Sequence, residues 1–445
     1  MNRKIFSNEA LRKLIIPLVI EQTLVMLVGV VDTSMVSFVG EAAVSGVALI
    51  DMVNYLVTVV LAAIDTGGAV IISHYLGRKD KENACKSASQ LLFITLLVSL
   101  GITIICILFH QILIGLLFGT ITDDVRKAAI TYFLITALSY PFLGLYNSAT
   151  AIFRSMERTS VTMYVSLLVN VVNVIGNVIG VFVLRAGVAG VAVPTLIARM
   201  AGAVIMVGMS FSPKNAVYVK LENAYVLEHD LIRRILKIAI PNGIENGLFA
   251  LGKVLVTSIV AVFGTSQIAA NGVANSIDMI AIIVVNAMNL AMITVVGQCR
   301  GAKEDGQAEY YTRKLMKISY VATGILGALV IMCLPLIRNF YQLSDETWRL
   351  ACILVVMHNI LAFFLHPTSF NLANSLRASG DAKITMYIGI GSMIVFRLGT
   401  AWLLGIVFQM GIIGVWIAMG MDWLARSVVF VVRYKSGKWR KIHVI

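Results

Sequence analysis

Four polar side chains in the N-terminal half of the chain have the types that bind a proton or an alkali cation. Asp32 lies in a long apolar run with no basic residue close to it. Asn173 and Asn177 are four residues apart, so they share one face of a helix, and Thr195 lies in the next apolar run. A carboxylate in hydrocarbon is costly and usually has a function. We interpret these four residues as a candidate binding site for a proton or an alkali cation.

The same residues lie at similar depths if the apolar runs are helices that cross a membrane. Asp32, Asn177 and Thr195 are each eight residues from the outer end of their run. At about 1.5 Å per residue, all three lie about 12 Å below the outer rim, with Asn173 one turn deeper. Oxygen-bearing groups at one level suit a hard cation or a network that carries a proton.

A second acid lies on the helix that carries Asp32. Glu21 is eleven residues earlier, about three turns, so both acids share one face. Glu21 is predicted either to pass protons inward, or to cap a neighbouring helix or lie at the inner mouth of the protein.

The C-terminal half has a different set of charged residues within its apolar runs. Asp422 and Arg426 are four residues apart and are expected to pair. The set forms either a charge-balanced structural network or a polar wall that faces substrate. Its members are Glu245, Lys253, Arg397, Asp422 and Arg426.

Cysteine and histidine spacing predicts no resident metal and no cofactor. The five cysteines form no CxxC motif and no Cys/His cluster. His358 and His366 are lone histidines in the sequence and are expected to be solvated or satisfied. The ion expected is the proton or alkali cation at the site of Asp32.

The composition is typical of a protein embedded in a bilayer. Hydrophobic residues make up 59% of the 445 residues, charged residues 13%, and the mean hydropathy is +0.88. Soluble proteins have about 25% charged residues. The apolar runs are long enough to cross a bilayer and do not alternate as barrel strands do. The predicted fold class is an all-α polytopic membrane protein of twelve transmembrane helices, at about 14–39, 45–73, 88–118, 127–152, 160–184, 188–211, 235–262, 268–298, 315–338, 348–373, 383–408 and 411–432.

The basic residues predict the orientation of these helices. With the N-terminus inside, 27 of the 36 Lys and Arg residues fall on the cytoplasmic side and five on the outer side. This asymmetry places both termini in the cytoplasm. It also accounts for the net charge of +13, so no nucleic-acid partner is expected. We expect a monomer whose partners are the lipid bilayer and a small substrate.

The second half of the chain repeats the first. "KLIIPLVIEQ" from Lys13 returns as "KIAIPNGIEN" from Lys237, which sets Pro17 over Pro241. Each half has six spans, an even number, so both halves enter the membrane from the same side and form a parallel repeat. The predicted domains are an N-terminal lobe at 1–211, a cytoplasmic linker at 212–230 and a C-terminal lobe at 231–445.

Several motifs occur in a characteristic order along the chain. They are "VDTSMVSFVG" in the first span, "YLGRKD" after the second, "NVVNVIGNVIG" in the fifth and "GVAGVAVPT" at the start of the sixth. With the repeat, they resemble the multidrug and toxic compound extrusion (MATE) transporters of the DinF-like bacterial branch, over essentially the whole chain. The resemblance implies an antiporter in the bacterial inner membrane. It would export small amphipathic or cationic compounds in exchange for H⁺ or Na⁺ by alternating access of two lobes.

The resemblance also implies roles for individual residues. Transporters of this branch are similar in having an Asp in span 1, an Asn-xxx-Asp pair in span 5 and a Thr in span 6. Asp32, Asn173 and Thr195 match this pattern, and Asn177 departs from it, because an acid is usual there. With one carboxylate fewer, a bound Na⁺ has less compensating charge, so the identity of the coupling ion stays open.

Two alternative functions would need features of their own. A lipid-linked precursor flippase of a related superfamily would favour spans beyond twelve and a strongly cationic cleft. An intramembrane enzyme would need a motif such as GxSxG or HExxH, and the sequence has neither. There is also no Walker A motif to bind ATP. We therefore expect a transporter and not an enzyme.

Overall fold

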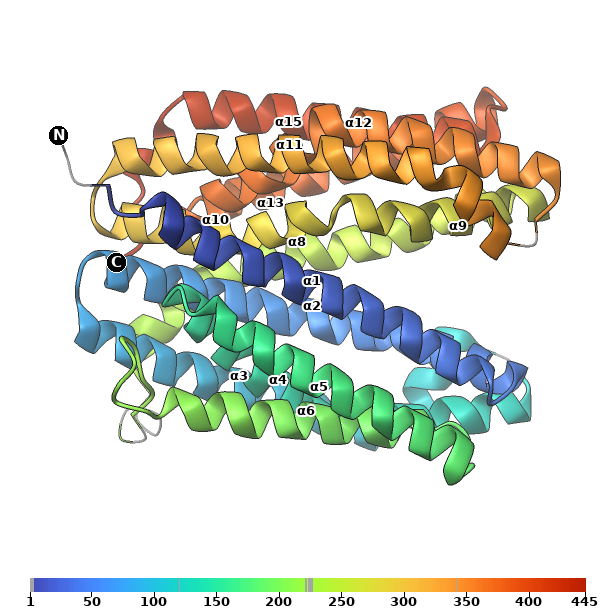
Figure 1. Ribbon diagram of the computed structural model, residues 1–445, viewed down its shortest axis with the longest axis horizontal. Helices are drawn as coiled ribbons and strands as arrows, with labels where there is room; N and C mark the ends of the chain where they lie inside the picture. The colour runs from blue at the N-terminus through green and yellow to red at the C-terminus, as the bar shows by residue number, and fades with distance from the viewer. Residues whose placement is uncertain (1–3, 120, 221, 223–226, 342) are drawn as a thin grey trace. The chain divides into compact units, whose positions relative to one another are not determined.

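The protein is helical over the residues that its computed structural model describes, which are 4–119, 121–220, 222, 227–341 and 343–445. No strand occurs among them (Figure 1). Within these ranges, twelve helices are long and apolar enough to cross a membrane. The predicted all-α fold with twelve spans is confirmed.

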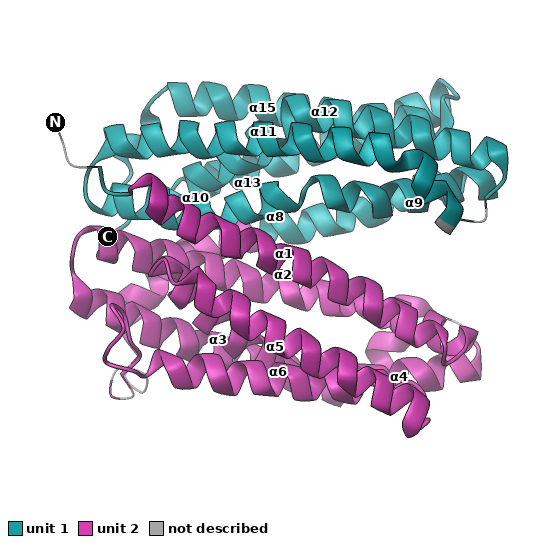
Figure 2. Cartoon of the chain, in the orientation of Figure 1, with its two compact units in different colours: residues 1–6, 244–444 teal, residues 7–243, 445 magenta. Residues whose placement is uncertain are grey.

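The helices of the N-terminal half form one compact unit, residues 7–243 with residue 445 (Figure 2). Helix α4 packs against α2, α3 and α6, and α5 packs against α1 and α6. The apolar core of the unit includes Tyr132, Phe133 and Tyr140. Its elements are α1 (Asn8–Ser37), α2 (Glu41–Gly77), α3 (Lys81–Phe118), α4 (Asp123–Ser155), α5 (Thr159–Val178), the π-helical turn η1 (Ile179–Val183) and α6 (Ala189–Ser210).

The second compact unit comprises residues 244–444 and the first described residues, 4–6. Helix α12 packs against α9, α10, α11 and α15, around a core that includes Trp348, Trp416 and Trp423. Its elements are the greater part of α8 (His229–Ala261), α9 (Thr265–Ala281), α10 (Ile283–Gly301), α11 (Asp305–Ile337), η2 (Arg338–Phe340), α12 (Asp345–Ala378), α13 (Ala382–Ser392), η3 (Met393–Gly399), α14 (Thr400–Trp402), η4 (Leu403–Val407), α15 (Gly411–Lys435) and η5 (Lys438–Lys441).

The compact units are defined by which residues contact one another, whereas the predicted lobes are defined by the sequence repeat. The units divide inside α8, after Gly243, rather than in the polar stretch at 212–230. Phe6 belongs to the second unit because its backbone N–H donates to the Tyr311 hydroxyl at 3.0 Å. The lobe boundaries at 211 and 231 stay a prediction about the repeat.

Polar residues cap the N-termini of several helices. Ser7 caps α1 by accepting a hydrogen bond from the backbone N–H of Ala10 at 3.0 Å. Asp80, in the loop between two spans, caps α3 by accepting from the backbone N–H of Asn83 at 3.1 Å. Side-chain and backbone hydrogen bonds from Asn83 hold the pKa of Asp80 below its ordinary value.

The sequence repeat is visible in the backbone. Ten of the twelve described residues with positive φ form pairs at matching positions of the two halves: Gly40 and Gly264, Lys79 and Lys303, Glu157 and Gly380, Arg185 and Gln409, and Gly187 and Gly411. The π-helical turns η1 and η4 match in the same way. The two halves therefore share the conformation of their loops as well as their order of helices.

Two predicted spans are interrupted. The eighth, predicted at 268–298, is two helices, α9 and α10, with a break at Ile282. The eleventh, predicted at 383–408, contains the π-helical segment η3, which includes Arg397. The equivalent part of α5 is regular α-helix. The second half therefore differs in backbone at the position that corresponds to Asn173.

Candidate functional site

Helices α5 and α6 approach each other closely because small residues line their contact. A Cβ atom added at Gly180 would overlap the carbonyl oxygen of Gly190, and one added at Gly176 would lie 2.6 Å from Cβ of Pro194. Glycine is the residue that permits such an approach between helices in a membrane. The contact brings the next turns of α5 and α6, where the predicted site residues lie, within hydrogen-bonding reach.

The four predicted coupling residues form one chain of hydrogen bonds. Nδ2 of Asn177 donates to Oδ1 of Asp32 at 2.7 Å and to Oδ1 of Asn173 at 3.1 Å. Nδ2 of Asn173 donates to Oγ1 of Thr195 at 3.0 Å. Both Asn side chains are buried and Asp32 is half-buried. The structure thus brings together the residues of α1, α5 and α6 to which the depth argument points.

Arg199 lies beside this chain and is absent from the site residues predicted from the sequence. It is one turn after Thr195 on α6, and its Nη1 donates to Oγ of Ser139 at 2.6 Å. Its guanidinium charge acts on both Asp32 and Asp51. The site therefore contains a fixed positive charge as well as a carboxylate.

Asp51 of α2 extends the polar region and is also absent from the residues predicted from sequence. Its Oδ1 accepts hydrogen bonds from the Tyr132 hydroxyl and from Nδ2 of Asn54, each at 3.2 Å. Oδ1 of Asn54 in turn accepts from the Tyr140 hydroxyl at 2.7 Å. Asp51 is eleven residues after Gly40, so counting depth along the second span would have indicated it.

Glu21 is engaged in an ion pair and makes no hydrogen bond to Asp32 among the described residues. Its Oε1 is 2.5 Å from Nη2 of Arg154, and its Oε2 accepts from the Thr162 hydroxyl at 2.9 Å. Both carboxylate oxygens are thus occupied by groups of α4 and α5. A role in passing protons inward stays a prediction.

Glu245, the counterpart of Glu21 in the repeat, makes the equivalent ion pair. Its Oε2 is 2.6 Å from Nη2 of Arg377, at the end of α12. Both side chains are buried. Each compact unit therefore ties its first span to its fourth by a Glu–Arg pair.

The other members of the predicted charged set, Lys253, Arg397, Asp422 and Arg426, do not all pair with one another. Asp422 and Arg426 pair as predicted, with 3.0 Å between Oδ1 and Nε, and Nη2 of Arg426 donates to the carbonyl of Gly389 at 3.1 Å. Ser392 also donates to Asp422. In the described part of the chain, no ion pair joins Lys253 or Arg397 to an acid.

An acid and a histidine form a further pair that the sequence does not indicate. Nδ1 of His358 is 3.2 Å from Oδ1 of Asp278, and Nδ2 of Asn359 donates to the same oxygen at 3.0 Å. The His358 ring lies edge-on to Trp416 and Trp423. His358 is thus a paired histidine in a core, and its partner lies on a different helix, beyond the reach of spacing rules.

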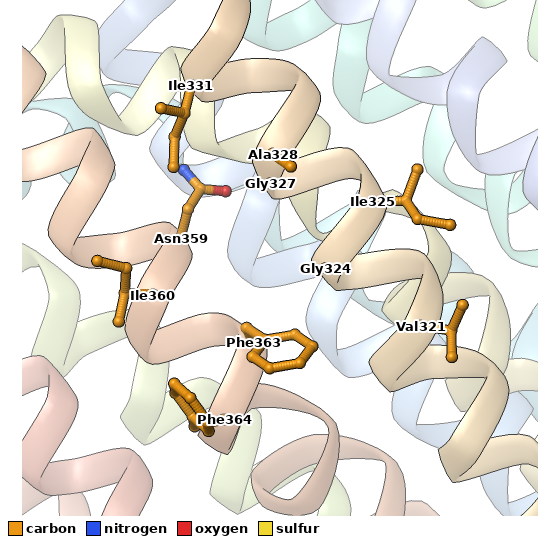
Figure 3. Close-up of a pocket in the computed structure, with 10 residues that line it drawn as sticks. All are labelled: Val321, Gly324, Ile325, Gly327, Ala328, Ile331, Asn359, Ile360, Phe363 and Phe364. Atoms are coloured by element: carbon orange, nitrogen blue, oxygen red, sulfur yellow. The ribbon is translucent and has the colours of Figure 1, made fainter.

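A groove of about 490 Å³ lies between α11 and α12 (Figure 3). Apolar side chains such as Ile325, Ile331, Phe363 and Phe364 line the groove. Among the lining residues, the one amide side chain is that of Asn359. The lining includes no charged residue. The groove therefore offers no group that could hold a coupling ion.

The glycine contact that positions the site gives a prediction. Gly180→Ala forces a methyl group against the backbone of Gly190, so we expect it to lower the stability of the protein by about 1–3 kcal/mol. Thermal unfolding of the purified variant measures this loss. Gly208→Ala on α6 is the matched control, because nothing lies within 4 Å of its added Cβ. Equal melting temperatures for Gly180→Ala and the wild type would contradict the close approach of α5 and α6.

Comparison with known proteins adds the family context. A model of the MatE family matches residues 17–179 and again residues 241–403. The two matches begin at Pro17 and Pro241, which the repeat sets over each other in the sequence. Together they include every one of the four coupling residues except Thr195.

Similar proteins match along almost their whole length. An uncharacterized transporter of Bacillus subtilis, YisQ, is 29% identical over 99% of this chain and 99% of its own. A probable multidrug resistance protein, NorM of Thermotoga maritima, is 25% identical over 98% of this chain and 94% of its own. A crystal structure of MATE in complex with MaL6 has the same fold, with a TM-score of 0.91, 20% identity, and coverage of 98% and 97%.

Proposed function

Because the chain belongs to the MatE family, whose model matches both of its halves, we propose that it exports small amphipathic compounds in exchange for H⁺. The resemblance to MATE transporters is confirmed, and the protein is a multi-pass membrane transporter rather than an enzyme. The exchanged ion and the chemical class of the substrate are the parts that we propose. The observation that carries the proposal is the hydrogen-bonded chain that ends at Asp32.

The site has the composition of a proton site. Asp32 is the one carboxylate of the four residues, and the Arg199 charge acts on it. The amide N–H groups of Asn177 and Asn173 point at Oδ1 of Asp32, Oδ1 of Asn173 and Oγ1 of Thr195. A hard cation needs several oxygen ligands at once, and here N–H donors already reach three of the five side-chain oxygens of these residues. A proton needs only one carboxylate oxygen.

Protonation of Asp32 has a structural consequence within the N-terminal unit. The bond from Asn177 to ionised Asp32 is charge-assisted and joins α1 to α5. When Asp32 gains a proton, this bond loses its charge assistance, so the attachment of α1 to α5 weakens. Loading and unloading of the proton can thereby bias α1 between two positions, which is what an alternating-access cycle requires.

Transport by reconstituted protein tests the proposal. We expect proteoliposomes with an imposed pH gradient to drive uptake or release of amphipathic fluorescent dyes at uniform Na⁺. An imposed Na⁺ gradient at uniform pH should drive none. Liposomes without protein control for passive dye redistribution. Transport driven by the Na⁺ gradient alone would replace H⁺ by Na⁺ as the coupling ion.

The orientation of the helices gives a separate prediction. Lys81, at the start of α3, is exposed and should face the cytoplasm, whereas Asp123, at the start of α4, is exposed and should face outward. Native Cys85 and Cys299 are buried, so they should contribute little labelling. In a background without the less buried Cys333 and Cys352, an impermeant maleimide should label Asp123→Cys on intact cells. It should label Lys81→Cys only after the membrane is opened. The reverse pattern would place both termini outside.

A further inference from the structure

The second compact unit contains three basic side chains and one acid in a single region of its membrane-spanning helices. Lys253 of α8, Arg397 of η3 and Arg426 of α15 interact electrostatically with one another or with Asp422. Asp422 accepts a hydrogen bond from Nε of Arg426. Lys253 and Arg397 have no acid partner among the described residues. The region therefore has two uncompensated positive charges.

The packing of the backbone sets these two cations beside each other. Met393, the first residue of η3, packs directly on Gly252, where an added Cβ would overlap Cε of Met393. Lys253 is the next residue of α8, and Arg397 is one turn further along η3. Arg397 adopts its place on a π-helical segment that the first half of the chain lacks at the equivalent position.

The side chains present free donors. The Lys253 side chain is exposed, and Nε of Arg397 is buried without a hydrogen-bond partner. Charged groups at membrane depth are costly, and they are found paired, facing a cavity or carrying out a function. Since no acid of the described chain neutralises this pair, an external anion is the group that would.

We propose that Lys253 and Arg397 bind an anionic group of the transported compound. The class of substrate is thus an amphipathic organic acid, such as a carboxylate on an apolar body. Arg397 offers a planar set of N–H donors that matches the two oxygens of a carboxylate, and Lys253 adds a point charge.

An aromatic surface lies next to the two cations. The Lys253 ammonium is 5.2 Å and the Arg426 guanidinium 5.0 Å from the centre of the Phe249 ring. The ring of Phe370 lies edge-on to Phe249 at 6.5 Å. These rings provide an apolar surface for the body of a compound whose acidic group contacts Lys253 and Arg397.

This inference rests on the proposed export of amphipathic compounds, and it names their charge. It is independent of the coupling ion, because it concerns binding and needs no gradient. Failure of the pH-gradient experiment would leave it standing, and its own failure would leave proton coupling at Asp32 standing.

The test compares three probes with the same ten-carbon chain: decanoate, decanamide and decyltrimethylammonium. Their binding to the purified full-length protein is measured by calorimetry, below their micelle concentrations and at a pH where decanoate is ionised. We expect decanoate to bind about tenfold more tightly than decanamide, because a charge-assisted hydrogen bond is gained. Lys253→Met and Arg397→Met should each remove most of this preference.

Matched variants separate a specific contact from a general loss of charge. Lys253→Arg keeps the charge and should keep the preference for decanoate. Lys317→Met removes an exposed cation of α11 in the same unit and should also keep it. Equal binding of decanoate and decanamide by the wild type would overturn the proposal, as would tighter binding of decyltrimethylammonium. An unchanged preference for decanoate in both Lys253→Met and Arg397→Met would also overturn the proposal. The comparison of the three probes uses the wild-type protein, so it does not depend on the folding of any variant.

Discussion

Asp32→Asn is expected to abolish export driven by a pH gradient while the protein is made at normal levels. The substitution keeps the shape of the side chain and removes the group that can gain and lose a proton. The Asn177 amide that donates to Oδ1 of Asp32 can donate to the new amide oxygen as well, so the fold should persist. Proteoliposome transport should fall to the level of protein-free liposomes. Substrate binding by calorimetry should remain, because the proposed substrate contacts lie in the other unit.

The control for this prediction is a second acid within the helices of the same unit, Asp65, which is buried. Asp65 of α2 accepts a hydrogen bond from the Ser148 hydroxyl at 2.6 Å and belongs to no part of the coupling chain. Asp65→Asn should therefore keep export driven by a pH gradient. If Asp32→Asn transports at the wild-type rate with unchanged dependence on pH, the coupling site lies elsewhere. Glu21→Gln is then the next variant to measure.

Neutralising one member of the Asp422–Arg426 pair is expected to cost about 3–5 kcal/mol of stability. Asp422 is 0% and Arg426 3% exposed, so either single change leaves a buried charge without its partner. Asp422→Asn and Arg426→Met should each lower the melting temperature and the abundance in the membrane. The double variant should recover part of the loss, because it leaves neither charge unpaired. Thermal unfolding and immunoblots of membranes measure both effects.

An exposed pair of the same spacing is the control for this cycle. Lys13 and Glu9 are also four residues apart, with 2.7 Å between Nζ and Oε1, but their side chains are 73% and 75% exposed. Exposed pairs contribute little, so Lys13→Met should leave the melting temperature unchanged. A stable Asp422→Asn protein that has lost transport would mean that the pair serves the substrate and not the fold.

Much of the fold could be predicted from the sequence because burial in a bilayer imposes long apolar helices. The predicted spans stop short of the observed helices at the loop between the second and third spans, where α2 continues to Gly77 and α3 begins at Lys81. These turns include polar residues such as His74, Lys81 and Glu82, which lower the local hydropathy, so an apolar run does not reach the ends of the helices. The break at Ile282 has no signal in the sequence either, because neither Pro nor Gly marks it.

The sequence predicts how far along their helices the site residues lie, but it does not predict which helices are neighbours. Counting residues from the outer ends places Asp32, Asn177 and Thr195 at one level, and their hydrogen bonds agree with this level. Which helices are neighbours depends on packing, such as the contact of Gly180 with Gly190, and a count along one helix contains no such information. From the sequence, Arg199 is therefore only a basic residue within a span.

The π-helical turns η1 and η4 also bear on the history of the chain. A turn of this kind is rare, and one extra residue within an α-helix produces it. Its presence at matching positions of both halves is what duplication of a segment that already contained the turn would produce. Among the described residues, the equivalent of η3 in the N-terminal half is regular α-helix that carries Asn173 where η3 carries Arg397. The two halves therefore share one irregular turn and differ at the other, and they differ where their candidate sites do.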